Sequence, residues 1–398
     1  MTAERIYLIS GLIRRACSRG YWPLLFVRLV TEVELSALEL VLLGTVMELT
    51  ILTMEIPTGV VADVYSRKWS VVISFVVMGV AMALSGLFEP YALLVATQIL
   101  IGFGNTFETG AETAWITAEL GGHEAAEPVI LRRARLQLLA GVVGIVGFAG
   151  LAAITSLTAA LVVIGAIYVG WSILLAVVMP ETNFERSRGE GWRAFTGMLA
   201  DGYGQARRIN PLKVLVIVVF IGGLAKEAID RLDVQRLVDV GLPSDIDEVL
   251  VIGLITAVKL LVASALLFAA HRRVGETDLI TAMAVLLFGV AVGVLLLAQV
   301  DVLGIAALGL ILQGGFHFAT EPVVTTWTNR FASDDARATV HSFMGQAEAF
   351  GEIVGGIVLG VVAQVISVPV AMTVSGVLFL IAAATTLRAR TGWDAAAP

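Results

Sequence analysis

Long apolar stretches recur from one end of the chain to the other, separated by short polar connections. About 20 apolar residues in a helix cross the ~30 Å hydrocarbon core of a bilayer, so each stretch predicts a membrane-spanning helix. Several stretches are longer, as tilted helices that project beyond the lipid would be. The pattern predicts twelve spans: Ile6–Val30, Leu38–Ala62, Trp69–Phe88, Tyr91–Glu119, Leu131–Thr155, Leu157–Met179, Leu212–Val240, Asp247–Ala270, Leu279–Val300, Val302–Arg330, Ala336–Ile366 and Pro369–Leu387.

Basic residues gather in every second connection. If the N-terminus is cytoplasmic, the opposite connections hold acids such as Glu89 and Asp245 and, between the predicted spans, neither Lys nor Arg. This is the asymmetry of the positive-inside rule, so the sequence predicts an even number of spans with both termini in the cytoplasm. The cytoplasmic connections would carry Arg67, Lys68, Arg132, Arg133, Arg186, Arg188, Arg193, Arg207, Arg208, Arg272, Arg273, Arg337, Arg388 and Arg390.

The composition agrees with this pattern. Of 398 residues, 58% are hydrophobic and 15% are charged, whereas about a quarter of a soluble chain is charged. The single cysteine, Cys17, excludes an internal disulfide and a cysteine-cluster metal site. Three arginines, Arg14, Arg15 and Arg19, interrupt the first apolar run, which is therefore not typical of a cleavable signal. No cofactor and no metal ion is expected.

The longest polar connection, Glu181–Pro211, divides the spans into two groups of six. We expect an N-terminal six-helix bundle over residues 1–180, a cytoplasmic linker over 181–211 and a C-terminal six-helix bundle over 212–398. Two related bundles about an axis normal to the membrane have this layout. Within the linker, Trp192–Arg208 predicts either a short amphipathic helix on the membrane surface or an unstructured tether.

Rows of glycine mark the fifth predicted span and its counterpart, the eleventh. Small residues at such spacings let helices approach closely, so these rows indicate packing faces more than binding sites. The fifth span carries Gly141, Gly144, Gly147 and Gly150, and the eleventh carries Gly345, Gly351, Gly355, Gly356 and Gly360.

A charged motif joins the second and third spans: Gly59, Asp63, Arg67 and Lys68. Gly59 and Asp63 lie one helical turn apart, so they share a face. Gly59 would let another backbone come close, and Asp63 would lie where lipid gives way to water. The two cations are costly to move through a bilayer, which fixes this end in the cytoplasm. A chance cluster of juxtamembrane charges is the alternative interpretation.

The motif and the predicted twelve spans resemble those of the major facilitator superfamily over essentially the whole chain. Segments that resemble its prokaryotic drug-efflux-like branches are Glu55–Gly59, Glu108–Trp115, Glu227–Leu232 and Ala336–Gln346. The resemblance implies that Glu119 pairs with Arg67 and that Asp63 faces the start of the eleventh helix. Such a cluster would latch the two halves on the cytoplasmic side, as a gate and not as a substrate site.

One departure from the family pattern concerns the fifth span. Proton antiporters of the superfamily often carry a Gly-Pro-x-x-Gly-Gly element there, and the glycine row of this chain has no proline. The antiporter interpretation is weaker for that reason, although it still stands.

Ionisable residues inside the membrane are expensive, so they face a cavity or pair with one another. Glu108 and Glu112 lie one turn apart, where mutual repulsion and burial favour a bound proton. They are therefore candidates for proton coupling, with each pairing to an arginine (Arg15 or Arg133) as the alternative. Further proton-coupling candidates are Asp230 and Glu348.

Other charged or polar residues within the spans are candidates for lining a substrate cavity. One pair among them has a simpler explanation, since Glu227 and Arg231 are four residues apart on one helix and can neutralise each other. The cavity candidates are Arg14, Arg15, Glu48, Glu227, Arg231 and Gln346.

The sequence therefore predicts a monomeric secondary active transporter of the cell membrane that exports a small apolar or amphipathic compound in exchange for protons. Alternatives are lipid or lysolipid translocation and proton-coupled symport, because Arg14 and Arg15 could attract an anionic group. The sequence has no nucleotide-binding loop of the kind that a primary pump would need. No feature indicates a nucleic-acid partner. The four histidines lie too far apart in sequence to suggest an enzyme. A transport-inactive scaffold or sensor on the same fold is a further alternative.

Overall fold

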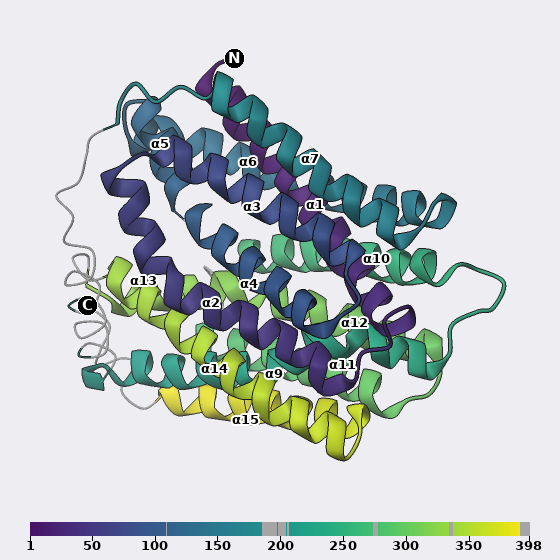
Figure 1. Ribbon diagram of the computed structural model, residues 1–398. Helices are drawn as coiled ribbons and strands as arrows, with labels where there is room; N and C mark the ends of the chain where they lie inside the picture. The colour runs from purple at the N-terminus through teal and green to yellow at the C-terminus, as the bar shows by residue number, and fades with distance from the viewer. Residues whose placement is uncertain are drawn as a thin grey trace. The chain divides into compact units, whose positions relative to one another are not determined.

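The computed structural model describes residues 1–108, 110–184, 207–273, 278–333 and 337–390, together with Gly197 and Gly204. Within these residues the chain forms α-helices and one short 3-10 turn, and no β-strand. Figure 1 labels the helices in chain order. They are α1 (Ala3–Thr31), α2 (Ala37–Val64), α3 (Arg67–Leu87), α4 (Tyr91–Glu108), α5 (Ala111–Glu119), α6 (His123–Ile154), α7 (Leu157–Val178), α9 (Asn210–Val240), α10 (Glu248–Arg273), α11 (Leu279–Gln299), α12 (Leu303–Phe318), α13 (Thr320–Phe331), α14 (Arg337–Val365) and α15 (Val368–Thr386), with the 3-10 turn η2 at Leu387–Arg390.

Nine helical segments in the described part of the chain are long and apolar enough to cross a membrane. They comprise α2, α3, α6, α7, α10, α11, the α12–α13 pair, α14 and α15. The chain is thus a multi-pass membrane protein in which α1, α4 and α9 do not meet the same criterion. Of these three helices, α1 and α9 carry several charged side chains, among them Arg14, Arg15, Lys226 and Glu227, whereas α4 carries one, Glu108.

The chain divides into two compact units. Unit 1 comprises Met1–Glu34, Val46–Arg193 and Ser244–Ala257, and unit 2 comprises Leu35–Thr45, Ala194–Pro243 and Val258–Pro398. The first turns of α2 therefore pack with unit 2, and the first turns of α10 pack with unit 1. The predicted boundaries of the two bundles, at residues 180 and 212, stay a prediction.

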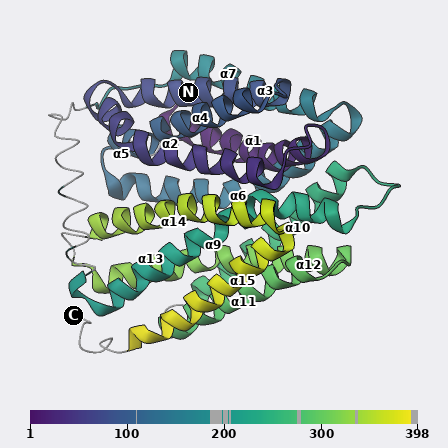
Figure 2. The same cartoon turned by 60° about the horizontal axis from the view of Figure 1, so that its bottom comes forward.

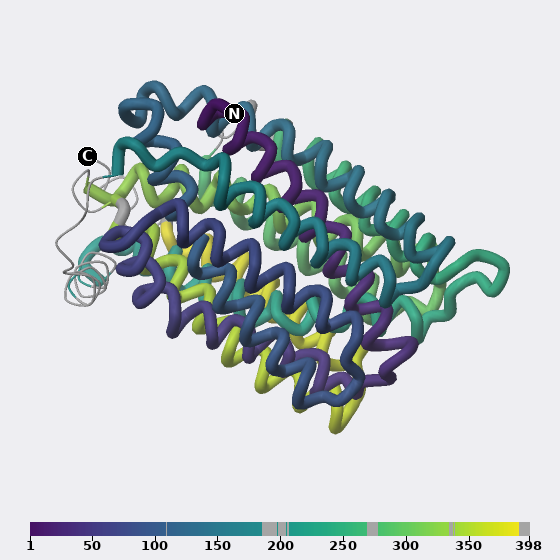
Figure 3. The backbone as a smooth tube through the Cα atoms, turned by 45° about the horizontal axis from the view of Figure 1, so that its top comes forward, coloured from purple at the N-terminus to yellow at the C-terminus, as the bar shows by residue number. Residues whose placement is uncertain are grey.

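The same helix pairs occur in both units. In unit 1, α1 packs along α6, and α3 packs along α4 and α7 (Figure 3). In unit 2, α9 packs along α14, and α11 packs along α12 and α15 (Figure 2). Counted from the first helix of each half, the pairs match one another, as internal repeats of transporter folds do.

Some glycines of the two predicted rows explain these close pairs. A Cβ atom at Gly144 of α6 would overlap the backbone of Ala16 in α1, and one at Gly355 of α14 would overlap the backbone of Leu224 in α9. By contrast, a Cβ at Gly147 or Gly345 would meet nothing within 4 Å. Only part of each row is therefore a packing face.

A buried arginine caps the third helix in each half. Arg28 of α1 donates to the carbonyl oxygens of Ser85 (3.3 Å) and Phe88 (2.9 Å) at the end of α3. Arg236 of α9 donates in the same way to Leu297 (3.0 Å) at the end of α11. The last carbonyls of a helix lack partners within it, and a cation near them also interacts favourably with the helix dipole.

Three predicted spans have different limits in the structure. The fourth span, Tyr91–Glu119, is broken into α4 and α5, and the tenth, Val302–Arg330, is broken into α12 and α13. The fifth span begins at His123 and not at Leu131, because its first turns are polar but helical. Consequently Arg133, which the charge pattern places in a cytoplasmic connection, is a buried residue of α6.

Two sequence predictions lie outside the described residues. Most of the expected amphipathic segment Trp192–Arg208 is not described, nor are the linker arginines Arg186, Arg188 and Arg193. The side chains of Arg272 and Arg273 at the end of α10 also lie outside the described part.

Candidate functional site

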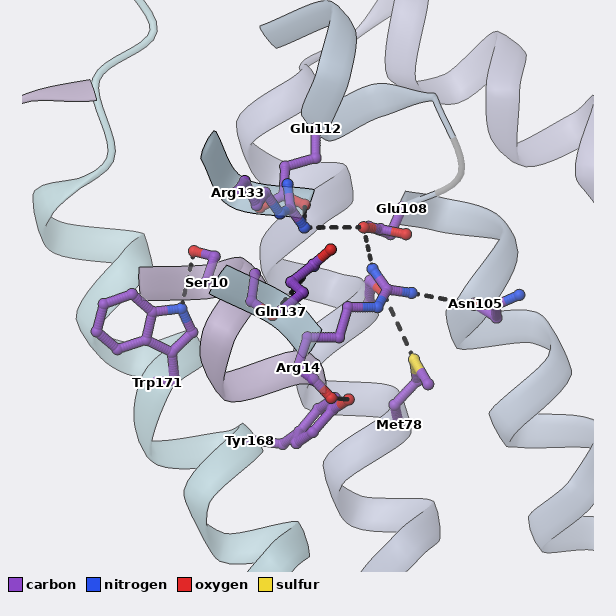
Figure 4. Close-up of polar contacts among 12 residues, drawn as sticks. Ser10, Arg14, Met78, Asn105, Glu108, Glu112, Arg133, Gln137, Tyr168 and Trp171 are labelled. Atoms are coloured by element: carbon purple, nitrogen blue, oxygen red, sulfur yellow. Dashed lines mark hydrogen bonds and ion pairs between the residues drawn. The ribbon is translucent and has the colours of Figure 1, made fainter. Parts of the chain in front are cut away.

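Two arginines and two glutamates form a cluster inside unit 1, contributed by four helices. Figure 4 shows Glu108 at the end of α4 between the guanidinium groups of Arg14 and Arg133. Glu108 forms an ion pair with Arg14 of α1. On its other side Arg14 donates a hydrogen bond to Oδ1 of Asn105 at 3.0 Å, so one helix, α4, binds the guanidinium twice.

The second ion pair of the cluster joins α5 and α6. Arg133 of α6 binds Glu112 at 2.6 Å and lies 4.0 Å from Glu108. The guanidinium of Arg133 also stacks over the ring of Tyr7, 4.2 Å from its centroid. A cation in this position gains from the ring quadrupole when water is excluded, so Arg133 has three separate partners.

The two ion pairs differ in exposure. The side chains of Arg14 and Glu108 are 17% and 16% exposed, whereas those of Arg133 and Glu112 are 9% and 3% exposed. The Arg14–Glu108 pair is therefore the less enclosed of the two. The Arg133–Glu112 pair is closed in, and breaking it would leave a buried charge without compensation.

Neighbouring polar groups fix the position of α1 in the cluster. The hydroxyl of Tyr168 in α7 donates to the backbone carbonyl of Arg14 at 3.4 Å. Gln137 of α6 donates to the carbonyl of Gly11 at 3.2 Å, and Trp171 of α7 donates to the hydroxyl of Ser10 at 3.0 Å. These three contacts hold the backbone that carries Arg14, so the guanidinium lies on a rigid support.

A break in the fourth span separates Glu108 from Glu112. Gly110 has a φ of +79°, a conformation that residues with a Cβ adopt at a cost. At the break, α4 ends at Glu108 and α5 begins at Ala111. The first turn of α5 contains Glu112. Discontinuous helices are a common way to build binding sites at the membrane midplane.

The cluster answers one question that the sequence left open. The two glutamates do not simply repel each other, because an arginine neutralises each of them. Of the two predicted partners, Arg133 is one, whereas Arg14 takes the place expected for Arg15. Asn105, Tyr168 and Gln137 were not predicted, because their partners lie far away in sequence and no short-range pattern marks them.

A second charged cluster lies within unit 2. Lys226 of α9 binds Glu352 of α14 at 2.7 Å and lies 3.9 Å from Glu348. Lys259 of α10 lies 3.5 Å from Asp233 of α9. The electrostatic neighbourhood of Lys226 also includes Asp230, so the two proton-coupling candidates of the second half, Asp230 and Glu348, share one cation.

The predicted pair of Glu227 and Arg231 is present in unit 2, with 2.9 Å between its atoms. Both side chains are buried, and they lie against Gly44 in the first turns of α2, where a Cβ would overlap them. This arrangement favours a structural role over cavity lining. Of the remaining cavity candidates, Arg15, Glu48 and Gln346 are half-buried on α1, α2 and α14.

The charged motif between α2 and α3 makes contacts that differ from the expected ones. Asp63 and Arg67 lie 3.6 Å apart, and Arg67 donates to the carbonyl of Ala114 in α5 at 3.2 Å. Among the described residues of unit 1, a Cβ at Gly59 would meet nothing within 4 Å, so no backbone of this unit makes the expected close approach.

Glu119 does not take the position that the resemblance implies. Its carboxylate accepts hydrogen bonds from the backbone N–H groups of Thr182 (2.7 Å) and Asn183 (3.0 Å), and from the Thr182 hydroxyl. Its described partners are thus in the segment that follows α7, and Arg67 is not among them. Glu119 therefore holds the start of that segment in place.

Glu181 is an unpredicted member of the motif. It accepts a hydrogen bond from the hydroxyl of Ser66 at 2.5 Å and one from the backbone N–H of Lys68 at 2.9 Å. Both groups belong to the N-terminus of α3, where a carboxylate is favoured by unpaired N–H groups and by the helix dipole. The end of α7 and the start of α3 are fastened together by this side chain.

The sequence profile of the Major Facilitator Superfamily matches residues 7–345. The chain belongs to the major facilitator superfamily. A relative from Bacillus subtilis (strain 168), named an uncharacterized MFS-type transporter YxaM, is 21% identical over 381 residues, which are 94% of this chain and 92% of that protein.

Solved structures with the same fold include several transporters of the superfamily. A mutant of the nucleoside transporter NupG is 12% identical with a TM-score of 0.79 and 99% coverage of both chains. A bacterial homolog of the human lysosomal transporter Spinster, inward-facing and occupied, is 13% identical with a TM-score of 0.79, covering 99% of this chain and 97% of that one. A POT family transporter in complex with a thioalcohol-conjugated peptide is 10% identical with a TM-score of 0.76, covering 98% and 96%. At these identities the likeness shows the MFS fold alone.

Proposed function

We propose that this MFS protein is a proton-coupled secondary transporter that moves a small amphipathic compound across the cell membrane. It would work as a monomer by alternating access, with twelve spans and both termini in the cytoplasm. Membership of the superfamily supports secondary transport. The transporters of the same fold carry names that refer to nucleosides and peptides, and these substrates belong to those proteins.

The partly exposed ion pair of Arg14 and Glu108 is the observation that carries the proton-coupling proposal. A partly exposed carboxylate such as Glu108 can gain and lose a proton more easily than the enclosed Glu112, which Arg133 binds. The two acids therefore have different roles, with Glu108 as the proton carrier and Glu112 as the group that positions Arg133. Ionisable residues in membrane helices mark proton and substrate paths in other transporters.

Two directions of coupling are open to this mechanism. Export by antiport is what the resemblance of Glu55–Gly59 to efflux-like branches implies, and a cationic substrate would then compete with a proton for Glu108. Symport is the second candidate, and the pairing of Glu108 with Arg14 favours it, because a cation approaching Glu108 would also meet the guanidinium.

The test is proton movement by purified protein. Proteoliposomes with an imposed pH gradient would be screened against cationic dyes, antibiotics, lysolipids and organic acids. Ligand-induced proton uptake or release in detergent would then be compared between the wild type, Glu108→Gln and Glu112→Gln. The matched control is Glu4→Gln, because Glu4 also pairs with an α6 arginine, Arg132 at 3.1 Å, but outside the cluster.

We expect Glu108→Gln to abolish proton movement and uphill transport while downhill exchange continues, and Glu4→Gln to behave as the wild type. Undiminished proton movement in the Glu108→Gln/Glu112→Gln double variant would overturn the assignment to this cluster. The Lys226 cluster, with Asp230 and Glu348, would then be the site to examine. Absence of ligand-dependent proton movement in every protein would overturn proton coupling itself.

A further inference from the structure

The Arg14–Glu108 pair has the form of an anion site whose present occupant is a side chain. Arg14 lies on a fixed stretch of α1, and its guanidinium is oriented by Asn105 as well as by Glu108. A guanidinium presents a planar fork of donors that matches the two oxygens of a carboxylate. The carboxylate of Glu108 also lies 4.0 Å from Arg133, so it is shared by two cations.

The formal charges of the four cluster residues, Arg14, Arg133, Glu108 and Glu112, sum to zero only while Glu108 is ionised. Arg14 faces it from α1, Arg133 from α6 and Glu112 from α5, and Asn105 belongs to its own helix. The surroundings of Arg14 also include Arg15 from α1 and the neutral Tyr168 from α7. When Glu108 takes up a proton, two guanidinium groups share the single carboxylate of Glu112.

An uncompensated cation in a partly dry site is unfavourable, and a bound anion removes that cost. We propose that the substrate is an organic monocarboxylate, and that it binds Arg14 in place of Glu108 when Glu108 is protonated. Proton and substrate then bind together, because each makes the site more favourable for the other. This inference rests on the proposed proton-coupled transport and assigns its direction as symport.

The Glu108 carboxylate, which pairs with Arg14 in the structure, indicates that the ligand is a carboxylate with one charge. Another carboxylate has the shape and charge of the Glu108 group that it replaces, so the balance of the cluster is restored. A phosphate monoester carries about −1.5 to −2 at neutral pH, so in place of Glu108 it would leave Arg14, Arg133 and Glu112 with a net negative charge. Tyr168 and Met78 lie beside Arg14 (Figure 4), and both side chains are buried.

The first test fills the vacated position with a probe. Glu108→Ala removes the side-chain carboxylate, and formate is small enough to replace it. Thermal unfolding of the purified protein at pH 8 would be measured in sodium formate and in sodium chloride at equal ionic strength. If the formate concentration is several times the Kd for this site, the Tm of Glu108→Ala should rise by about 2–4 °C relative to chloride.

Three controls locate the effect. The wild type has its own carboxylate in place, so formate and chloride should give the same Tm. Glu112→Ala also lacks a carboxylate of the cluster, but this position is enclosed, so formate should not restore it. Addition of Arg14→Gln to Glu108→Ala should remove the formate effect. Equal Tm values in formate and chloride for Glu108→Ala, or a formate effect that survives Arg14→Gln, overturn the proposal.

The second test uses a variant that keeps the size of the side chain. Glu108→Gln imitates the protonated acid, and benzoate and benzylamine present the same ring with opposite charges. Benzoate should raise the Tm of Glu108→Gln at pH 8 and benzylamine should not, whereas equal effects of the two contradict the anion site. No membrane or pH gradient is involved in either test. A carboxylate effect on Tm without any proton-coupled flux would therefore overturn the proposed function and leave the anion site. Proton-coupled flux without a carboxylate effect on Tm would overturn the anion site and leave the proposed function.

Discussion

The carboxylate of Glu181 accepts a hydrogen bond from the backbone N–H of Lys68 over 2.9 Å, although the two residues are 113 positions apart. The same carboxylate binds the hydroxyl of Ser66, the N-cap residue of α3. The charged motif after α2 is thus attached to the end of α7, and the first residues of the linker belong to the same assembly.

Replacement of Glu181 should loosen this end of unit 1. Loss of a side chain that binds a helix N-terminus costs about 1 kcal/mol, which predicts a fall in Tm of about 2–4 °C for Glu181→Ala. Glu89→Ala is the control, since Glu89 is an exposed glutamate of the connection between α3 and α4. The prediction fails if the two variants unfold at the same temperature.

Arg67→Ala should shift the balance between inward-open and outward-open states without a large loss of protein. Arg67 binds both Asp63 and the Ala114 carbonyl of α5, and a change of about 1.4 kcal/mol between two states alters their ratio tenfold. The measurement is the labelling rate of a cavity cysteine from each side of the membrane. Unchanged rates in Arg67→Ala and Asp63→Asn would show that the motif is not a gate.

Replacement of Glu112 should destabilise the protein more than replacement of Glu108. Glu112→Gln breaks an enclosed ion pair, for which a loss of about 3–5 kcal/mol is typical, and Glu108→Gln breaks a more exposed one and should cost less. Addition of Arg133→Gln to Glu112→Gln should recover part of the loss, because the unpaired cation is then gone. Thermal unfolding in detergent measures all three, and a greater loss for Glu108→Gln would contradict the assigned roles.

The glycine row of α6 offers a comparison within one helix. Gly144→Ala forces a Cβ into the backbone of Ala16, and overpacking of this kind costs about 1–3 kcal/mol. Gly147→Ala meets open space and should gain up to about 1 kcal/mol of helix propensity. Opposite shifts of Tm are therefore expected, and equal shifts would show that α1 and α6 do not approach as described.

The predicted orientation can be measured with single cysteines. In a Cys17→Ser background, Ser244→Cys should react with an impermeant reagent added outside the cell, and Glu124→Cys should react only after the membrane is opened. Both positions are exposed in the structure. Labelling of Glu124→Cys in intact cells would reverse the topology.

The membrane-spanning pattern was predictable because lipid acts on every residue of a long stretch, so the signal accumulates along the chain. The limits of the helices were less predictable. The turns of α6 before Leu131 are helical although their residues are polar. Hydropathy detects residues that favour lipid, and it does not detect a polar helical turn outside the lipid. The break at Gly110 was missed because one glycine hardly changes the average over the fourth span.

The site was predictable only in part, for a related reason. Glu108, Glu112 and Arg14 stand out because a charge in an apolar stretch is conspicuous by itself. Their pairing depends on how α1, α4, α5 and α6 pack, which no short-range pattern reveals, and the sequence therefore predicts Arg15 as a partner in the place that Arg14 takes. Glu181 was missed because a glutamate in a polar connection is ordinary until its partner in α3 is seen.

The three arginines in the middle of α1 have a consequence for the synthesis of the protein. A central arginine costs about 2.5–3.5 kcal/mol during insertion by the translocon, and the carboxylate that neutralises Arg14 is 108 − 14 = 94 residues further along the chain. At about 5–20 residues per second, the ribosome needs roughly 5–20 s to supply it. During that interval α1 is a poor membrane segment, so its stable insertion has to await α4. A chain without Glu108 should therefore insert less efficiently, so variants at this position are expected in lower yield than the wild type.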